Sequence, residues 1–176
     1  MMKGNKMNKR LIIVLLGTAC VGKTTTENKM VKELGFNPVY ITTTRPARDD
    51  DPAHYRFVSD AEFEATKGFD FTIAPAFKYG YNITAQDLSV VSFISPVNVD
   101  EFLDVMKNKD GIEVKVIKLT ASEDAMKDCM ESRNMTDAYE RAKAADTGMR
   151  QVDYTFNRDV ALRQISNIVH EYRGEA

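Results

Sequence analysis

The sequence predicts an α/β domain in which a parallel sheet is covered by helices on both faces. Short apolar runs alternate with longer segments of helical periodicity, and the first run, residues 11–16, leads through a glycine-containing loop into a helical stretch at 23–34. Because parallel strands need a crossover between them, this alternation is typical of a doubly covered sheet. A chain of 176 residues with 43% hydrophobic content is long enough for one such domain.

The expected elements follow one another along the chain. Strands are expected at residues 11–16, 38–42, 89–94, 113–119 and 154–156. Helices are expected at residues 23–34, 100–107, 122–133, 136–147 and 160–172. A ligand of such a sheet binds beyond the carboxyl ends of its strands.

Residues 44–81 do not follow this alternation of core strands and helices. They contain a charged loop at 45–51, extended pieces at 55–58 and 69–74, and a helix announced by the capping box Ser59-Asp60-Ala61-Glu62. We expect a small insertion that projects over the carboxyl edge of the sheet. The predicted organisation is one domain, with a tail at 1–10, a core at 11–43 and 82–176, and the insertion at 44–81.

The loop after the first strand reads G-x-x-x-x-G-K-T, which predicts a P-loop NTPase-type sheet that binds ATP. Its backbone N–H groups would surround the phosphates, Lys23 would reach the β- and γ-phosphates, and Thr24 would hold Mg²⁺. The residues predicted to bind ATP here are Gly17, Thr18, Ala19, Cys20, Val21, Gly22, Lys23, Thr24 and Thr25. A chance glycine turn is the alternative, but strand, loop and helix occur together as the motif requires.

Charge, apolar run length and cysteine content argue against several classes of protein. The net charge of -2 gives no general basic surface, so nucleic-acid binding is not expected, and a secretory signal is disfavoured because the apolar run at 11–16 is short. No apolar run approaches membrane-spanning length. Cys20 and Cys129 stand in different segments and predict neither a metal site nor a disulfide, which fits a cytoplasmic setting. Cys20 is expected to be the more reactive thiol, and Cys129 a packing residue.

Residues 41–59 carry the features of an acceptor site. They include I-T-T-T-R-P-A-R at 41–48 and Y-R-F-V-S at 55–59, and the pair Tyr79-Gly80 follows. The sequence here resembles the guanylate kinases, whose insertion for the nucleoside monophosphate (NMP) has a T-T-R-x-x-R turn, a Y-x-F-V strand and a Y-G pair. The resemblance continues in the same order through Arg133-Asn134, Arg141 and residues 152–157, and so spans nearly the whole chain.

The chemistry of a monophosphate fits these residues without reference to a family. A phosphate that carries close to two negative charges is well bound by the planar forks of Arg45 and Arg48, and the hydroxyls of Tyr55 and Tyr79 add donors without charge. The resemblance further implies a helical lid near 133–150 whose Arg133 and Arg141 act in catalysis together with Lys23, and an ATP contact at Asn157. The alternative for the arginines is a solvated charged loop.

The resemblance fails at the positions that recognise the guanine base in the family. The family has a glutamate and an aspartate there, but this chain has Ile73 and, at the second position, Ser95 or Val97; Tyr81 replaces a serine. Buried guanine N–H donors would stay unpaired, so a pyrimidine or modified deoxynucleotide fits this insertion at least as well as GMP. A lid arginine of the family is replaced by Cys129. No acid follows the strand at 89–94, so Mg²⁺ is expected to be held by ATP oxygens, Thr24 and water.

The sequence therefore predicts ATP- and Mg²⁺-dependent phosphoryl transfer to a (deoxy)nucleoside monophosphate, which gives the diphosphate. Nucleotides are the expected partners, and the protein is expected to be a monomer or homodimer. Two alternatives stay open. One is a guanylate kinase-like binding module with weak catalysis, and the other is a kinase for a modified nucleotide or another phosphorylated small molecule. The complete phosphate loop favours an enzyme.

Overall fold

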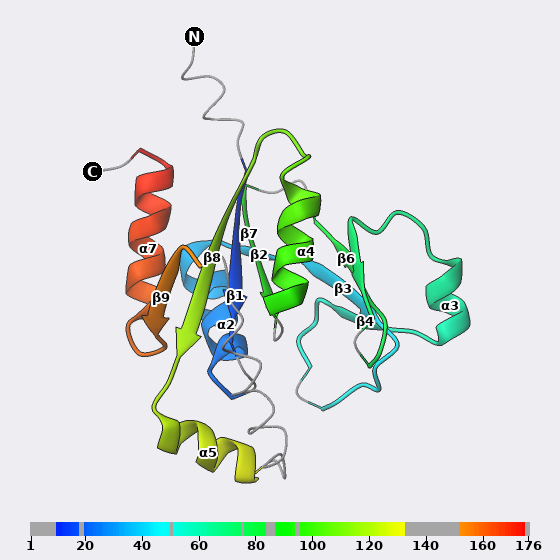
Figure 1. Ribbon diagram of the computed structural model, residues 1–176, viewed down its shortest axis with the longest axis horizontal. Helices are drawn as coiled ribbons and strands as arrows, with labels where there is room; N and C mark the ends of the chain where they lie inside the picture. Colours follow the sequence, from blue (N-terminus) through cyan, green and yellow to red (C-terminus); the bar gives the residue numbers. More distant parts are fainter. Residues whose placement is uncertain are drawn as a thin grey trace.

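The computed structural model describes residues 10–17, 20–49, 51–74, 76–83, 87–93, 96–132 and 152–174 (Figure 1). Its core is a parallel sheet of five strands in the order β2-β7-β1-β8-β9. The strands are β1 (Arg10–Leu16), β2 (Asn37–Pro38), β7 (Leu88–Phe93), β8 (Ile112–Thr120) and β9 (Tyr154–Asn157). The helices around it are α2 (Lys23–Leu34), α4 (Pro96–Met106), α5 (Glu123–Ser132) and α7 (Ala161–Tyr172). The predicted parallel sheet is confirmed.

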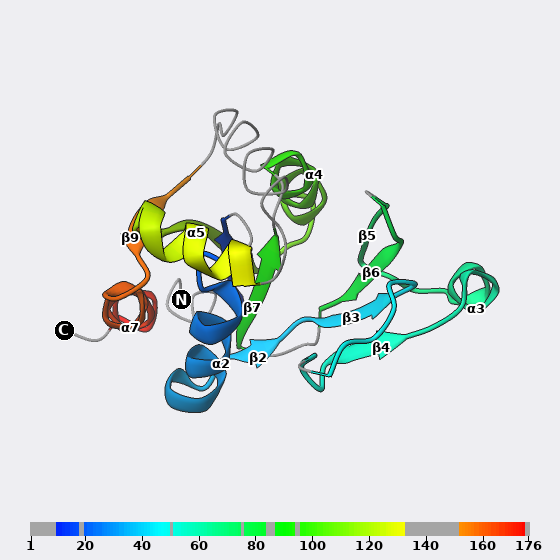
Figure 2. The same cartoon turned by 90° about the horizontal axis from the view of Figure 1, so that it is seen from below.

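The central strand β1 is buried on both faces. Leu11, Ile13 and Leu15 pack with α2 and α7 in one hydrophobic cluster, whereas the alternate residues of β1 pack with α4 in a second cluster. Successive side chains of a strand point to opposite faces, so a continuous apolar run serves two layers. Figures 1 and 2 show α2 and α7 on one face and α4 on the other, while α5 crosses the carboxyl ends of the strands.

A second sheet forms the projecting insertion. Its order is β4-β3-β6-β5, with the strands β3 (Tyr40–Thr43), β4 (Tyr55–Phe57), β5 (Phe71–Ile73) and β6 (Tyr79–Asn82). The single strand expected at 38–42 is wrong, because Asn37–Pro38 pairs with β7 in the core and Tyr40–Thr43 pairs with β4 and β6. Only Val39 separates the two sheets, and its N–H donates to the carbonyl of Val90 at 3.0 Å.

Strand β6 had no counterpart among the predicted strands. Its sequence, Y-G-Y-N, contains glycine and asparagine, which are depleted in strands and hide the pattern. The glycine has a packing reason, since a Cβ on Gly80 would lie 2.5 Å from the ring of Phe69. The Tyr79-Gly80 pair is therefore partly a structural feature, which allows an aromatic ring to lie directly on the backbone of the sheet.

The helices agree closely with the sequence pattern. Helix α2 has the expected bounds and ends at Gly35, whose φ of 75° is the left-handed conformation of a helix C-cap. Helix α3 (Asp60–Ala65) begins with the expected capping box between Ser59 and Glu62. Helix α4 begins four residues earlier than predicted, at Pro96. The helix expected at 136–147 and the lid near 133–150 lie outside the described residues.

Candidate active site

Two of the described residues in the loop after β1 have left-handed backbone conformations. Gly22 has a φ of 105°, and Cys20 has a φ of 68°, which is uncommon for a residue with a side chain. Gly22 occupies the N-cap position and offers no side chain to the first turn of α2, so the N–H groups of that turn face the loop. A Cβ on Gly17 would lie 2.6 Å from Cγ1 of Val21. Gly17 and Gly22 are therefore required by close packing and by backbone conformation respectively, as the predicted phosphate loop would need.

Lys23 lies along this loop. Its Nζ donates to the carbonyl of Gly17 at 2.6 Å. Burial lowers the pKa of Lys23 to about 8, although the charge of nearby Glu27 raises it. Bound phosphates would favour the protonated ammonium, as the predicted role of Lys23 requires.

Glu27 was not predicted as a site residue. It is 6% exposed on α2, one turn after Lys23, and burial raises the pKa of its carboxyl to about 7 against the opposing effect of Lys23. The i, i+4 spacing places both side chains on one face of the helix, and this spacing was the available signal. The first two turns of α2 thus carry two groups that titrate close to neutral pH.

The predicted acceptor residues of the second sheet share one face. Tyr55 and Tyr81 both lie opposite Ile41, and Tyr79 lies opposite Thr43 and Ile73. Side chains at paired positions of neighbouring strands project to the same side. Tyr55, Ile73, Tyr79 and Tyr81 therefore lie on one face of the second sheet, and their role in acceptor binding stays a prediction. Burial raises the pKa of Tyr55 to about 12 and also raises the pKa of Tyr81, so both hydroxyls are protonated donors at neutral pH.

Arg45 lies over this aromatic face. The centre of its guanidinium is 5.6 Å from the centroid of the Tyr55 ring and 5.4 Å from that of Phe57. Its Nη2 donates to Oδ1 of Asp51 at 2.7 Å, and Nη1 donates to the carbonyl of Pro46 at 3.0 Å. The side chains of Arg45 and Asp51 are each 11% exposed, so this pair is not part of a solvated loop.

Arg48 belongs to the same cluster through its backbone. Its N–H donates to Oδ2 of Asp51 at 2.5 Å, while the residue as a whole is exposed. Burial favours a higher pKa for the Asp51 carboxyl, but the hydrogen bonds from Arg45 and Arg48 hold the pKa below its usual value. The reverse balance acts on Arg45, where burial favours a lower pKa and Asp51 raises it. The guanidinium of Arg45 and the N–H of Arg48 thus both donate to one carboxylate of the chain itself, that of Asp51.

The threonines of the T-T-R turn fix the position of this cluster. Oγ1 of the fully buried Thr43 accepts from the N–H of Arg45 at 3.1 Å. Thr44 is held to Lys78, the residue before β6: the Thr44 N–H donates to the carbonyl of Lys78 at 3.1 Å, and its Oγ1 accepts from the N–H of Lys78 at 3.0 Å. Short hydroxyl side chains commonly fix turns in this way. The turn therefore directs Arg45 onto the aromatic face.

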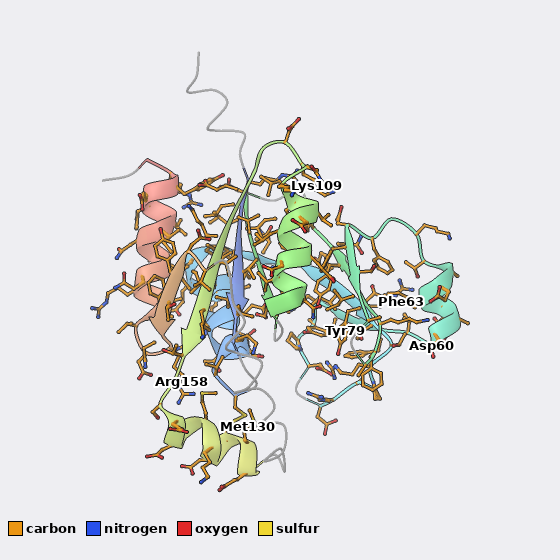
Figure 3. All side chains as sticks on the ribbon, in the orientation of Figure 1. Asp60, Phe63, Tyr79, Lys109, Met130 and Arg158 are labelled. Atoms are coloured by element: carbon orange, nitrogen blue, oxygen red, sulfur yellow. A yellow bond between two sulfur atoms is a disulfide. The ribbon has the colours of Figure 1, made fainter. Side chains whose placement is uncertain are left out.

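Arg158 also lies near the phosphate loop, and the sequence pattern did not predict it as a site residue. A Cβ on Gly22 would lie 3.2 Å from Cδ of Arg158, so the Arg158 stem packs on the loop (Figure 3). The backbone of Arg158 is held to β8, because its N–H donates to the carbonyl of Thr120 at 2.8 Å. The predicted ATP ligand Asn157 is exposed beside it, and its Oδ1 accepts from the N–H of Asp159 at 2.9 Å. The position of Arg158 next to Asn157 was the one signal in the sequence.

The two cysteines correct an expectation. Cys20 of the phosphate loop and Cys129 of α5 form a disulfide, with Cα atoms 5.9 Å apart, although 109 positions separate them in the sequence. The prediction that they do not pair is therefore wrong. Sequence separation carries little information here, because α5 crosses the carboxyl ends of the strands and so reaches the loop (Figure 2).

Several predicted residues are not placed by the structure. Thr18, Ala19, Ser95, Arg133 and Arg141 lie outside the described residues. The predicted Mg²⁺ ligand Thr24 is exposed in the first turn of α2, as is Thr25. Among the described side chains, no three His, Cys, Asp or Glu residues are grouped so that they could hold a metal ion. None of the helices in the described part of the chain combines the length and the apolar character needed to cross a membrane.

The architecture has a counterpart among solved structures. A crystal structure of guanylate kinase from Anaplasma phagocytophilum matches this chain with a TM-score of 0.63, covering 93% of this chain and 86% of that chain. This protein has a guanylate kinase-like fold. The sequence identity is 17%, so the match establishes the fold and not the substrate. No protein-family model and no curated protein sequence matches the chain.

Proposed function

We propose that this protein is an ATP-dependent kinase that transfers the γ-phosphoryl group to a (deoxy)nucleoside monophosphate and so forms the diphosphate. One observation carries the proposal: a complete phosphate loop occurs in a guanylate kinase-like fold whose second sheet gathers an arginine and three tyrosines on one face. Phosphoryl transfer depends mainly on positioning and on neutralisation of charge. These two groups of residues provide both.

The donor side is assigned to the phosphate loop. Its N–H groups and Lys23 would bind the ATP phosphates, and the Thr24 hydroxyl would hold Mg²⁺ together with ATP oxygens and water. This ion neutralises charge on the phosphates when bound. The aliphatic stem of Arg158 packs against Gly22, and we assign its guanidinium to the same nucleotide. We further assign Asn157 to ATP binding and Arg133 and Arg141 to neutralisation of the migrating phosphoryl group.

The acceptor side is assigned to Arg45, Arg48 and the tyrosines. Arg45 makes its contacts with Asp51 through Nη1 and Nη2, and a guanidinium has five N–H donors, so further donors remain for a phosphate. The phosphate would also compete with the Asp51 carboxylate for the same cation. Tyr55 and Tyr79 add hydroxyl donors on the same face. A dianionic monophosphate matches this set better than a neutral hydroxyl compound.

The base is proposed to be other than guanine. Ile73 and Tyr81 lie on the face that would line the base pocket, and neither offers a carboxylate to the N1 and N2 donors of guanine. Tyr81 is 4% exposed and adds bulk. A pyrimidine or modified base leaves fewer donors unpaired there. We place this activity in the cytoplasm, where ATP and nucleoside monophosphates are available.

A coupled assay with ATP, Mg²⁺ and a panel of ribo- and deoxynucleoside monophosphates tests the proposal under reducing conditions. We expect turnover with at least one of them and GMP as a poor acceptor. Lys23→Ala should abolish turnover, whereas Lys29→Ala, which changes an exposed lysine of the same helix, should retain it. Undiminished turnover by Lys23→Ala would refute the kinase assignment. If GMP is the best acceptor, the base pocket is misplaced.

A second candidate is a binding module that holds a phosphorylated ligand without catalysis. Two observations favour this candidate. In the Arg45–Asp51 pair, Asp51 neutralises the guanidinium assigned to the acceptor, and Cys129 stands where the family has a lid arginine. This candidate predicts binding of a nucleoside monophosphate without turnover of the panel. Calorimetric titration of the unreactive monophosphates distinguishes it from the kinase.

A further inference from the structure

We propose that Cys20 and Cys129 form a reversible thiol–disulfide site whose oxidation weakens ATP binding at the phosphate loop. The two residues come from the loop between β1 and α2 and from α5, and their Cα separation of 5.9 Å lies in the range that a disulfide requires. No free cysteine remains in the chain when this bond is present. The part concerning ATP rests on the ATP binding assigned under the proposed function, but not on phosphoryl transfer, and the thiol chemistry rests on neither.

The surroundings of Cys20 favour its thiolate. It lies three residues before Lys23, whose ammonium contacts the loop at Gly17, and it precedes the N-terminus of α2. Positive charge and a helix N-terminus both lower the pKa of a cysteine and raise its reactive fraction. Both cysteines are half-buried, so a small reagent has access to the pair. Cys20 is accordingly assigned as the attacking thiol and Cys129 as the resolving thiol.

The oxidant is a low-molecular-weight disulfide such as oxidised glutathione. The Cys20 thiolate attacks one of its sulfurs, which forms a mixed disulfide and releases one glutathione thiolate. Cys129 loses its proton, attacks the sulfur of Cys20 and displaces the second glutathione thiolate. The two cysteines together lose two electrons and two protons, and the oxidant becomes two molecules of glutathione thiol. Excess glutathione thiol reverses both steps.

The bond joins two parts of the site that serve different tasks. Cys20 belongs to the loop that would surround the ATP phosphates, and Cys129 belongs to α5, which follows β8 in the core. In Figure 2 helix α5 lies across the end of the sheet at which this loop is found. A covalent tie between the loop and α5 restricts the loop, whereas nucleotide binding requires such segments to adjust. Oxidation is therefore expected to oppose ATP binding.

Linkage provides a test that does not depend on turnover. If the disulfide lowers ATP affinity about tenfold, a coupling of ordinary size, then saturating ATP must shift the thiol–disulfide equilibrium about tenfold toward the thiols. The purified chain is equilibrated in glutathione buffers of graded ratio, with and without ATP, quenched with acid, alkylated and mapped by mass spectrometry. We expect a disulfide-linked pair of peptides that contain Cys20 and Cys129. The midpoint, which is the glutathione ratio at which half of the protein is oxidised, should shift when ATP is present.

Variants identify the roles of the two thiols. In Cys129→Ser the mixed disulfide should persist on Cys20, whereas in Cys20→Ser the modification of Cys129 should be slower. Absence of the Cys20–Cys129 pair at every glutathione ratio would refute the site, and faster modification of Cys129 would reverse the assigned roles. A midpoint that ATP leaves unchanged would refute the coupling. A shift by ATP in a protein that turns over no monophosphate would instead refute the proposed function and leave this inference standing.

Discussion

Arg45 is bound by the carboxylate of Asp51 at 2.7 Å in a cluster where each of the two side chains is only 11% exposed. Removal of one partner from a largely buried ion pair leaves the other charge without compensation. We expect Asp51→Ala to lower the free energy of unfolding by about 2 kcal/mol, which urea denaturation monitored by circular dichroism measures. Asp49→Ala changes an exposed carboxylate of the same loop and is the control. Equal effects of the two variants would contradict a structural role for the pair.

The acceptor assignment predicts a selective kinetic effect. Arg45→Ala and Arg48→Ala should each raise the KM for the monophosphate by about 10- to 100-fold, the usual worth of a charge-assisted hydrogen bond. The KM for ATP should change little, because ATP is assigned to the other side of the site. Steady-state kinetics with each substrate varied in turn provide the measurement. Arg56→Ala, which alters an exposed arginine of β4, should leave both values unchanged. Parallel changes in both KM values would place the arginines elsewhere.

The position of Arg158 predicts the opposite selectivity. Because its stem packs on Gly22 of the phosphate loop, Arg158→Ala should raise the KM for ATP by roughly tenfold and leave the KM for the acceptor nearly unchanged. Arg163→Ala, at an exposed position of α7, is the matched control. If Arg158→Ala binds ATP as the unmodified protein does, the guanidinium is directed away from the donor nucleotide.

Glu27 predicts a pH dependence of stability. Its pKa is raised by burial to about 7, above its ordinary value, so between these pH values the folded protein retains a proton that the unfolded chain releases. Stability is therefore lost as the pH rises through this window, by an amount on the order of 3 kcal/mol. Glu27→Gln removes the ionisation. The free energy of unfolding of this variant, relative to that of the unmodified protein, should therefore increase from pH 5 to pH 7.5.

Chemical denaturation at several pH values, with a reducing agent present throughout, measures this difference. Glu33→Gln, which changes an exposed glutamate of the same helix, should follow the unmodified protein at each pH. A constant difference between Glu27→Gln and the unmodified protein across this range would show that the Glu27 carboxyl does not titrate there.

The sequence predicted those features that depend on local patterns. The P-loop spacing, the capping box at Ser59 and Glu62 and the bounds of α2 all follow from residues close to one another in the chain. Contacts between distant segments were not predictable in this way. The bond between Cys20 and Cys129 depends on where α5 crosses the sheet, and the capture of Arg45 by Asp51 depends on how the charged loop folds back.

The division of the chain into two sheets escaped prediction for a different reason. Residues 38–42 have the composition of one strand, and nothing in that composition marks Val39 as the point where one sheet ends and another begins. Strand β6 was hidden by its glycine, whose need is visible only with Phe69 in place. Such features are fixed by packing between elements, to which residue patterns respond only indirectly.

The two sheets are joined through the single residue Val39, so a change in its backbone angles would turn one sheet relative to the other. From Val39 to Thr43 the extended chain covers about 13 Å, so a rotation of about 10° at the junction would move Thr43 by about 2 Å. The N–H of Arg45 is bound to Thr43, and Arg45 would move with it. A displacement of this size decides whether a guanidinium reaches a phosphate oxygen. A small change in angle beside β7 would therefore change the distance between the two proposed substrate sites.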